Sequence, residues 1–375
     1  MSIAYKSIVG PLVIKGLAMV FSILYAKFVV FYNGELIYGE LSKSILYGNL
    51  IFVVALFAFS NWVLADLNTR MGSFKLGLFG VVIRLVIFSS ALFLVNDVMS
   101  IVIFLTGFVL LLAEVLRVKG KFFQFELIKG FLLKSSILLS LLCAYTEILQ
   151  LAVLLIVILI LTKEIDISVL ALSDFYRPKS YWMYSSELLN QVIANLTLIL
   201  GSIFFNNEIF ARISVVILVV NVLGLSYSVI SNYFQKDFST KTGKDLRRSF
   251  EASRLISGFG ALSLSIMLGF ISKYLFEYIG VNVNSELMSW LYVTLLTSSV
   301  AFSFGPIGLI LDRTGNSRLR FISLIIGLIL AIILAIILTL FLSNGYAAVF
   351  IPYLCVKIVP PLLSYIFMKH AKILE

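Results

Sequence analysis

The chain alternates between long apolar runs and short polar clusters, and this pattern predicts helices that cross a membrane. Runs of about 20 mainly apolar residues recur, which is the length that an α-helix needs to cross the hydrocarbon core of a bilayer. We expect twelve such helices, near residues 8–31, 44–65, 76–95, 98–114, 123–143, 147–162, 181–205, 210–234, 253–272, 287–311, 321–342 and 346–368. The pattern therefore predicts an all-α polytopic membrane protein.

The predicted helices divide into two bundles of six. A polar segment separates the sixth helix from the seventh, so we expect an N-terminal bundle over 1–165, a cytoplasmic connecting loop over 166–180 and a C-terminal bundle over 181–375. A second long polar segment, 235–252, is expected to be an inner loop between the eighth and ninth helices, and 312–318 is expected to be a tight inner turn.

A weak internal repeat supports this division. Residues 31–45 (FYNGELIYGELSKSI) follow the first predicted helix, and residues 204–217 (FFNNEIFARISVVI) follow the seventh. With one gap at Leu36, the two segments share Phe, Asn, Glu, Ile and Ser at matching positions. Because each half has an even number of helices, the halves are expected to have parallel topology around an axis along the membrane normal, with a central cavity between them.

Composition agrees with a membrane location and excludes most enzyme classes. The chain is 61% hydrophobic and 13% charged, with a mean hydropathy of +1.08, whereas soluble domains are roughly 25% charged. It contains one histidine, His370, five residues from its end, which argues against Ser-His-Asp triads and histidine metal sites. We therefore predict a protein that is not an enzyme and has no cofactor and no metal.

The net charge of +10 indicates positively charged cytoplasmic loops rather than nucleic-acid binding. With the N-terminus in the cytoplasm, nineteen of the 29 lysine and arginine residues fall on inner segments and only three on outer loops. Cytoplasmic loops of membrane proteins carry this excess of positive charge. We expect both termini to be cytoplasmic.

Several cations lie inside the predicted spans. Arg84, Lys134 and Lys357 lie near the middle of the third, fifth and twelfth helices, and Lys15 lies in the cytoplasmic half of the first. A charge at the bilayer centre costs at least about 2.5 kcal/mol, so such residues need either a partner or water. Pairing with carboxylates is one interpretation. Because acids are scarce within the spans, we favour a water-filled cationic cavity that attracts an anionic solute.

The seventh helix carries a polar stripe at three- and four-residue intervals. Its members are Glu187, Asn190, Gln191 and Asn195. The stripe is expected either to line the cavity or to bind a neighbouring helix, and Glu187 is a weak candidate for ion coupling. Prolines around Lys357 and the segment 304–308 (FGPIG) predict a kinked or broken twelfth helix and a weakened end of the tenth.

Four short motifs resemble a known family. They are YGELS at 38–42, FFNNEIFAR at 204–212, YFQKDF at 233–238 and LDRTG at 311–315. Together with twelve spans in two halves, they are similar to the multidrug/oligosaccharidyl-lipid/polysaccharide exporter superfamily, and within it to the bacterial O-antigen flippases of the Wzx type.

This resemblance implies a bacterial inner-membrane transporter for surface polysaccharide assembly. Its substrate would be an undecaprenyl-pyrophosphate-linked oligosaccharide, with the lipid tail in the membrane and cations such as Lys15, Arg84, Lys134 and Lys357 binding the pyrophosphate. A polysaccharide polymerase and a chain-length regulator would be its partners. The alternatives are a lipid II flippase, a multidrug exporter or, from another class, a membrane-embedded polysaccharide enzyme.

Overall fold

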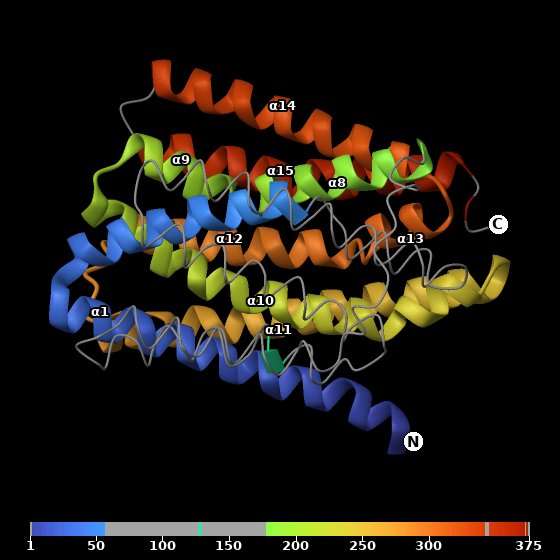
Figure 1. Ribbon diagram of the computed structural model, residues 1–375, viewed down its shortest axis with the longest axis horizontal. Helices are drawn as coiled ribbons and strands as arrows, with labels where there is room; N and C mark the ends of the chain where they lie inside the picture. The colour runs from blue at the N-terminus through green and yellow to red at the C-terminus, as the bar shows by residue number, and fades with distance from the viewer. Residues whose placement is uncertain (1, 57–126, 129–177, 342–344, 372, 374–375) are drawn as a thin grey trace, which may run out of the picture. The chain divides into compact units, whose positions relative to one another are not determined.

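A computed structural model of the 375-residue chain defines the structure of residues 2–56, 127–128, 178–341, 345–371 and 373. Every regular element assigned a range in these residues is helical (Figure 1). With the labels of Figure 1, the elements are α1 (Ser2–Leu56), α8 (Pro178–Ala194), α9 (Leu196–Phe204), α10 (Asn207–Thr240), α11 (Gly243–Ile279), α12 (Ser285–Ser303), α13 (Ile307–Arg313), α14 (Ser317–Phe341) and α15 (Gly345–His370).

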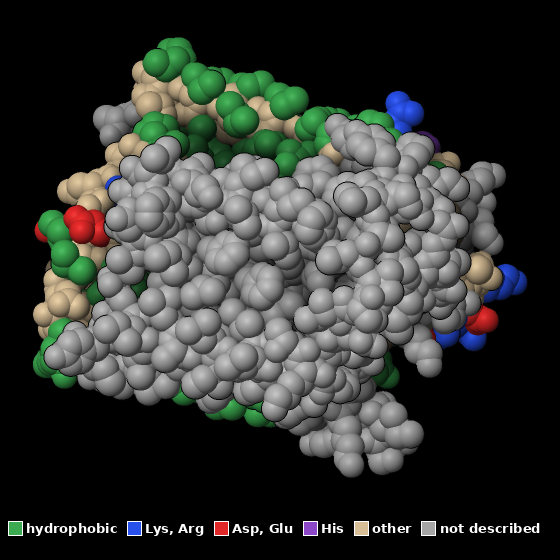
Figure 2. All heavy atoms as spheres, viewed as in Figure 1, with side chains coloured by type: hydrophobic (Ala, Val, Ile, Leu, Met, Phe, Trp, Pro, Cys, Tyr) green, Lys and Arg blue, Asp and Glu red, His purple; other side chains and the backbone are tan. Residues whose placement is uncertain are grey.

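Six stretches of these helices are long and apolar enough to cross a membrane. They are Val13–Tyr47, Asn207–Ser231, Gly243–Ile279, Ser285–Asp312, Ser317–Phe341 and Gly345–His370. A bent pair, Ser185–Ala194 with Leu196–Phe204, makes seven if it counts as one span. Hydrophobic side chains lie exposed along α14, as expected for a helix that faces lipid (Figure 2). The helices predicted at 76–95, 98–114, 123–143 and 147–162 lie outside the described residues, apart from two positions of the third of these.

The first two predicted helices form one element with a break. At Gly34, α1 has φ 83° and ψ 169°, which a residue with a side chain rarely adopts, and Figure 1 shows the α1 ribbon turning back on itself. Residues 35–43 were predicted to lie outside the spans, but they are helical. The prediction placed the turn correctly and made it too long, because the polar residues there lower hydropathy without interrupting backbone hydrogen bonding.

The prediction of an inner loop at 235–252 is wrong for the same reason: polar residues lower hydropathy there without interrupting the helices. Helix α10 continues to Thr240 and α11 begins at Gly243, so only two residues join them. Lys241 closes α10 with its backbone N–H on the Asp237 carbonyl (2.9 Å), and its Nζ donates to the Asp237 carboxylate (2.7 Å). Helices therefore extend past the apolar runs into the polar segment.

The breaks expected in the tenth and twelfth helices have different outcomes. The tenth span is interrupted at 304–306, between α12 and α13, where Gly305 has φ 75°, as predicted. Helix α15 runs as one element through Pro352, Pro360 and Pro361, so the twelfth helix is not broken there, and the alternative of a kink stays a prediction.

Two compact units divide the chain. One contains residues 1–8, 26–46 and 189–375, and the other contains 9–25 and 47–188. Within the first unit, α11 packs against α10 and α12, and α14 packs along α15. The predicted domains at 1–165 and 181–375 stay a prediction, since most of the first lies outside the described residues.

Candidate functional site

The polar stripe of the seventh span ends at a bend. Helices α8 and α9 meet at an angle of 52°, and Asn195 lies between them. The Gln191 carbonyl accepts both the backbone N–H of Asn195 (3.2 Å) and its Nδ2 (2.9 Å). An asparagine side chain that binds the preceding turn in this way competes with the helical pattern. Asn195 thus has a local structural role, while Glu187 and Asn190 lie half-buried on α8.

Lys357 lies at the centre of α15 and its ammonium faces an aromatic ring. Its Nζ is 4.9 Å from the centroid of Tyr353, whose side chain is buried. In the described part of the chain, no carboxylate pairs with Lys357. A ring face stabilises a cation by only about 0.5–2 kcal/mol, so this charge is less compensated than one in an ion pair.

The bend and Lys357 are joined by one hydrophobic cluster. Ile193 and Leu196 on either side of Asn195 pack in the same cluster as Tyr353 and Val356 of α15, together with Leu324 and Ala331 of α14. The ring under the Lys357 ammonium is therefore part of the core that holds the bend of the seventh span. One hydrophobic cluster thus contains residues next to Asn195 and residues next to Lys357.

The other predicted cations lie in the second compact unit or outside the described residues. Lys15 is half-buried on α1 in the second compact unit, and Arg84 and Lys134 lie outside the described residues. In the residues that the structure describes, no group of three or more His, Cys, Asp or Glu side chains is placed to hold a metal ion.

A cluster that sequence reasoning did not assign to the site joins the two repeat segments. We call it the Glu35 cluster: Glu35, Gly39, Glu40, Asn207, Arg212 and Asn282. The Glu35 carboxylate accepts from the Arg212 Nε (2.7 Å) and from the backbone N–H of Asn282 (3.0 Å). The Glu40 carboxylate accepts from the Asn207 Nδ2 (3.1 Å). The weak repeat at 31–45 and 204–217 was the signal that could have found this contact.

The pairing within the Glu35 cluster is reciprocal to within one residue of the repeat. Glu35, early in the first repeat, binds Arg212, late in the second, while Glu40, late in the first, binds Asn207, early in the second. Two related segments that meet across a two-fold axis make contacts of this kind. The pattern agrees with the internal duplication and with an axis between the repeat segments.

Gly39 permits this close contact. A Cβ built on Gly39 would overlap the backbone carbonyl of Asn207, so the two segments can meet only where residue 39 has no side chain. Lys43 adds a contact nearby, since its Nζ lies 3.5 Å from the Phe205 carbonyl.

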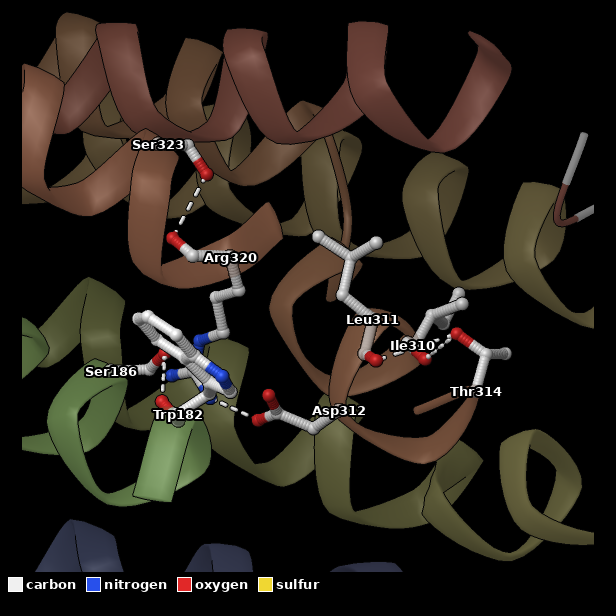
Figure 3. Close-up of polar contacts among 8 residues, drawn as sticks. All are labelled: Trp182, Ser186, Ile310, Leu311, Asp312, Thr314, Arg320 and Ser323. Carbon is white, nitrogen blue, oxygen red and sulfur yellow. Dashed lines mark hydrogen bonds and ion pairs between the residues drawn. The ribbon is translucent and has the colours of Figure 1, made fainter. Parts of the chain in front are cut away.

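A different ion pair lies at the turn between α13 and α14. Asp312 and Arg320 form an ion pair whose side chains are 11% and 14% exposed (Figure 3). The same close-up shows Thr314 Oγ1 donating to the Ile310 carbonyl (2.9 Å), which caps α13. These contacts confirm the prediction of a tight turn at 312–318.

Comparison with known proteins identifies the fold. No protein-family model matches the chain, and no curated protein matches it. Solved structures of transporters share its fold over nearly their whole length. The MATE multidrug transporter DinF-BH has a TM-score of 0.66 at 12% identity, with 99% of this chain and 96% of that chain covered.

Two further structures extend this likeness. An outward-facing multidrug resistance MATE family transporter has a TM-score of 0.62 at 13% identity, covering 98% of this chain and 96% of that one. A MOP superfamily transporter from Pyrococcus furiosus, with a binding pocket of reverse polarity, has a TM-score of 0.63 at 12% identity, with 98% and 96% covered. The chain therefore has the all-helical fold of these transporters, and the six or seven candidate spans in its described residues are those of a multi-pass membrane protein.

Proposed function

We propose that this protein is a transporter, not an enzyme, that flips an anionic lipid-linked oligosaccharide across the bacterial inner membrane for O-antigen or other surface polysaccharide assembly. The observation that carries the proposal is Lys357, a lysine at the centre of a span with an aromatic ring and no carboxylate beside it in the described residues. A cation kept in that position at a cost of a few kcal/mol favours a substrate of negative charge. The transporter fold of the structural neighbours is consistent with this function.

The mechanism we propose is alternating access with the Glu35 cluster as its outer gate. Both termini would be cytoplasmic, so the turn at Gly34 and the break at 205–206 would lie at the outer surface. Hydrogen bonds and one ion pair join the repeat segments there, and such contacts exchange for water at little net cost when they separate. The substrate would enter from the cytoplasm while this gate is closed and leave when it opens.

Within the cavity, Lys357 would bind the pyrophosphate with Lys15, Arg84 and Lys134. Asn190 and Gln191 would offer hydrogen bonds to the sugars, and the bend at Asn195 would let α8 and α9 move as separate segments. Glu187 stays a weak candidate for ion coupling. A polysaccharide polymerase and a chain-length regulator would act on the exported unit.

Replacing Lys357 tests this function in a strain whose surface polysaccharide depends on the protein. We expect Lys357→Ala to reduce the polysaccharide by about tenfold, because a lost charge-assisted contact to a phosphate weakens binding by about that factor. Lys357→Arg should retain most of it. Lys273→Ala, which removes an exposed lysine at the end of α11, is the matched control. Full-length polysaccharide from a normally inserted Lys357→Ala variant would contradict the proposal.

A multidrug exporter is the second candidate, and the structural neighbours favour it. Two of the neighbours described above are multidrug transporters. A central lysine disfavours cationic drugs, so the two functions make opposite predictions. If Lys357→Ala leaves polysaccharide unchanged and the wild-type chain raises resistance to drugs, the exporter is the better assignment.

A further inference from the structure

The seam between α11 and α12 is closely packed by small side chains. Ser265 Oγ lies 2.5 Å from Ser299 Oγ, and Ser299 Oγ donates to the Ala261 carbonyl (3.1 Å). A Cβ on Gly258 would meet the Ser303 Cβ at 3.2 Å. Because the two backbones approach this closely, the seam itself is shallow. The larger side chains on either side project farther from the helices than the small ones along the seam.

A furrow therefore runs along this seam. Its first part has a volume of about 620 Å³, with a floor of Gly258, Ser299 and Ser303 and walls that include Leu255, Phe259, Leu262, Leu296 and Val300. A second hollow of about 280 Å³ continues along the same two helices past Ile266 and Phe270, and it shares Leu296 with the first. The walls are apolar, and Phe259 and Phe270 are 69% and 77% exposed.

A cation lies at one end of the furrow. Arg254 is the last charged residue before the uncharged stretch 255–272, which places it at the boundary between polar and apolar environments. Its Nε donates to the Ser303 carbonyl (3.1 Å), and its guanidinium faces the Tyr365 ring at 5.0 Å. No carboxylate pairs with Arg254 in the part of the chain that the structure describes.

The surroundings of Arg254 leave this end positive. Glu251 also lines the furrow, but its carboxylate pairs with the Arg247 Nε at 2.9 Å. On the same helix Lys244, Asp245 and Arg248 are exposed, so the cations there outnumber the acid. A group that carries negative charge is therefore attracted to this end, and Arg254 has guanidinium donors beyond the one that Ser303 uses.

We propose that this furrow binds the single polyisoprenyl chain of a lipid phosphate, with the phosphate at Arg254. The proposal rests on the proposed function and adds to it the place where the carrier lipid docks. Length argues for this occupant: residues 254–270 of α11 span about 24 Å, whereas one leaflet provides only about half of the roughly 30 Å hydrocarbon thickness. One long chain fills the furrow, while a phospholipid has two chains that end near the midplane.

Lipid binding to the full-length purified protein tests the inference. The probes are undecaprenyl phosphate, without sugars, and phosphatidylglycerol, and retained lipid is measured by native mass spectrometry. Leu262→Trp fills the furrow from a wall position that is 42% exposed, and Ile332→Trp, at a 47% exposed position on α14, is the matched control. Arg254→Gln removes the charge and Arg254→Lys keeps it.

We expect the wild type to retain undecaprenyl phosphate in preference to phosphatidylglycerol. Leu262→Trp and Arg254→Gln should each weaken its retention by about tenfold, the factor that corresponds to one lost charge-assisted contact or a comparable apolar contact. Ile332→Trp and Arg254→Lys should retain it. Equal retention of both lipids, or wild-type retention by Leu262→Trp, would overturn the inference.

The lipid-binding experiment can fail or succeed independently of the proposed function. Binding of the bare lipid phosphate needs neither sugars nor flipping, so furrow binding in a protein that makes no polysaccharide would support the furrow and reject the function. Normal polysaccharide from Leu262→Trp, with unchanged lipid retention, would reject the furrow and leave the function standing.

Discussion

Two ion pairs in the described residues differ in what they hold together. Asp312 and Arg320 are eight residues apart and lie on either side of one turn, with side chains 11% and 14% exposed. Glu35 and Arg212 are 177 residues apart and join the two repeat segments, with side chains 17% and 29% exposed. The first pair stabilises a turn whatever the rest of the chain does. The second exists only while two distant segments touch, so a change of state is expected to break it.

The largest expected effect comes from breaking the local pair. Asp312→Asn removes the carboxylate from this largely buried ion pair, and we expect a loss of about 3–5 kcal/mol in the free energy of unfolding. Thermal unfolding of the purified protein measures it. Glu251→Gln breaks an exposed pair on α11 and should cost under about 1 kcal/mol. If Asp312→Asn and Glu251→Gln were equally stable, the buried pair would contribute no more to stability than the exposed pair of Arg247 and Glu251.

Gly39→Ala should break the distant contact without unfolding the protein. The added Cβ meets the Asn207 carbonyl, so the closed arrangement becomes less populated by about tenfold. The readout is disulfide formation between Glu40→Cys and Asn207→Cys in a chain whose two native cysteines are replaced by alanine.

Gly16→Ala is the control for this variant, since a Cβ there meets nothing within 4 Å. A crosslinking yield that Gly39→Ala leaves at the wild-type level would contradict the close contact.

The smallest effect is expected for the distant ion pair itself. Glu35→Arg and Arg212→Glu should each lower the crosslinking yield several-fold, because a partly exposed ion pair contributes about 1 kcal/mol. The double variant should recover part of the yield through the reversed pair. Recovery should stay incomplete, since an arginine in place of Glu35 cannot accept the hydrogen bond that the Asn282 N–H donates to the glutamate. No recovery in the double variant would argue that charge does not hold the segments together.

Within the described residues, the sequence by itself determined which stretches are long and apolar enough to cross a membrane. Each span must satisfy its own backbone hydrogen bonds in lipid and must be apolar over a fixed length, so hydropathy is read locally from consecutive residues. The spans at 210–234, 321–342 and 346–368 correspond to α10, α14 and α15 for this reason, although helices extend beyond them at their polar ends. Gly305 and Pro306 likewise predicted the interruption between α12 and α13 from chemistry that acts within a few residues.

Only the tertiary structure decided which residues meet. Hydropathy marks Glu35 and Arg212 alike as polar residues near helix ends, and no local pattern states that they bind each other across 177 residues. The ring beneath Lys357 and the furrow along α11 and α12 also depend on how helices pack, which a uniformly apolar surface does not specify. In lipid the hydrophobic effect does not select a packing face, so small residues, hydrogen bonds and ion pairs decide it, and these act between segments that are remote in sequence.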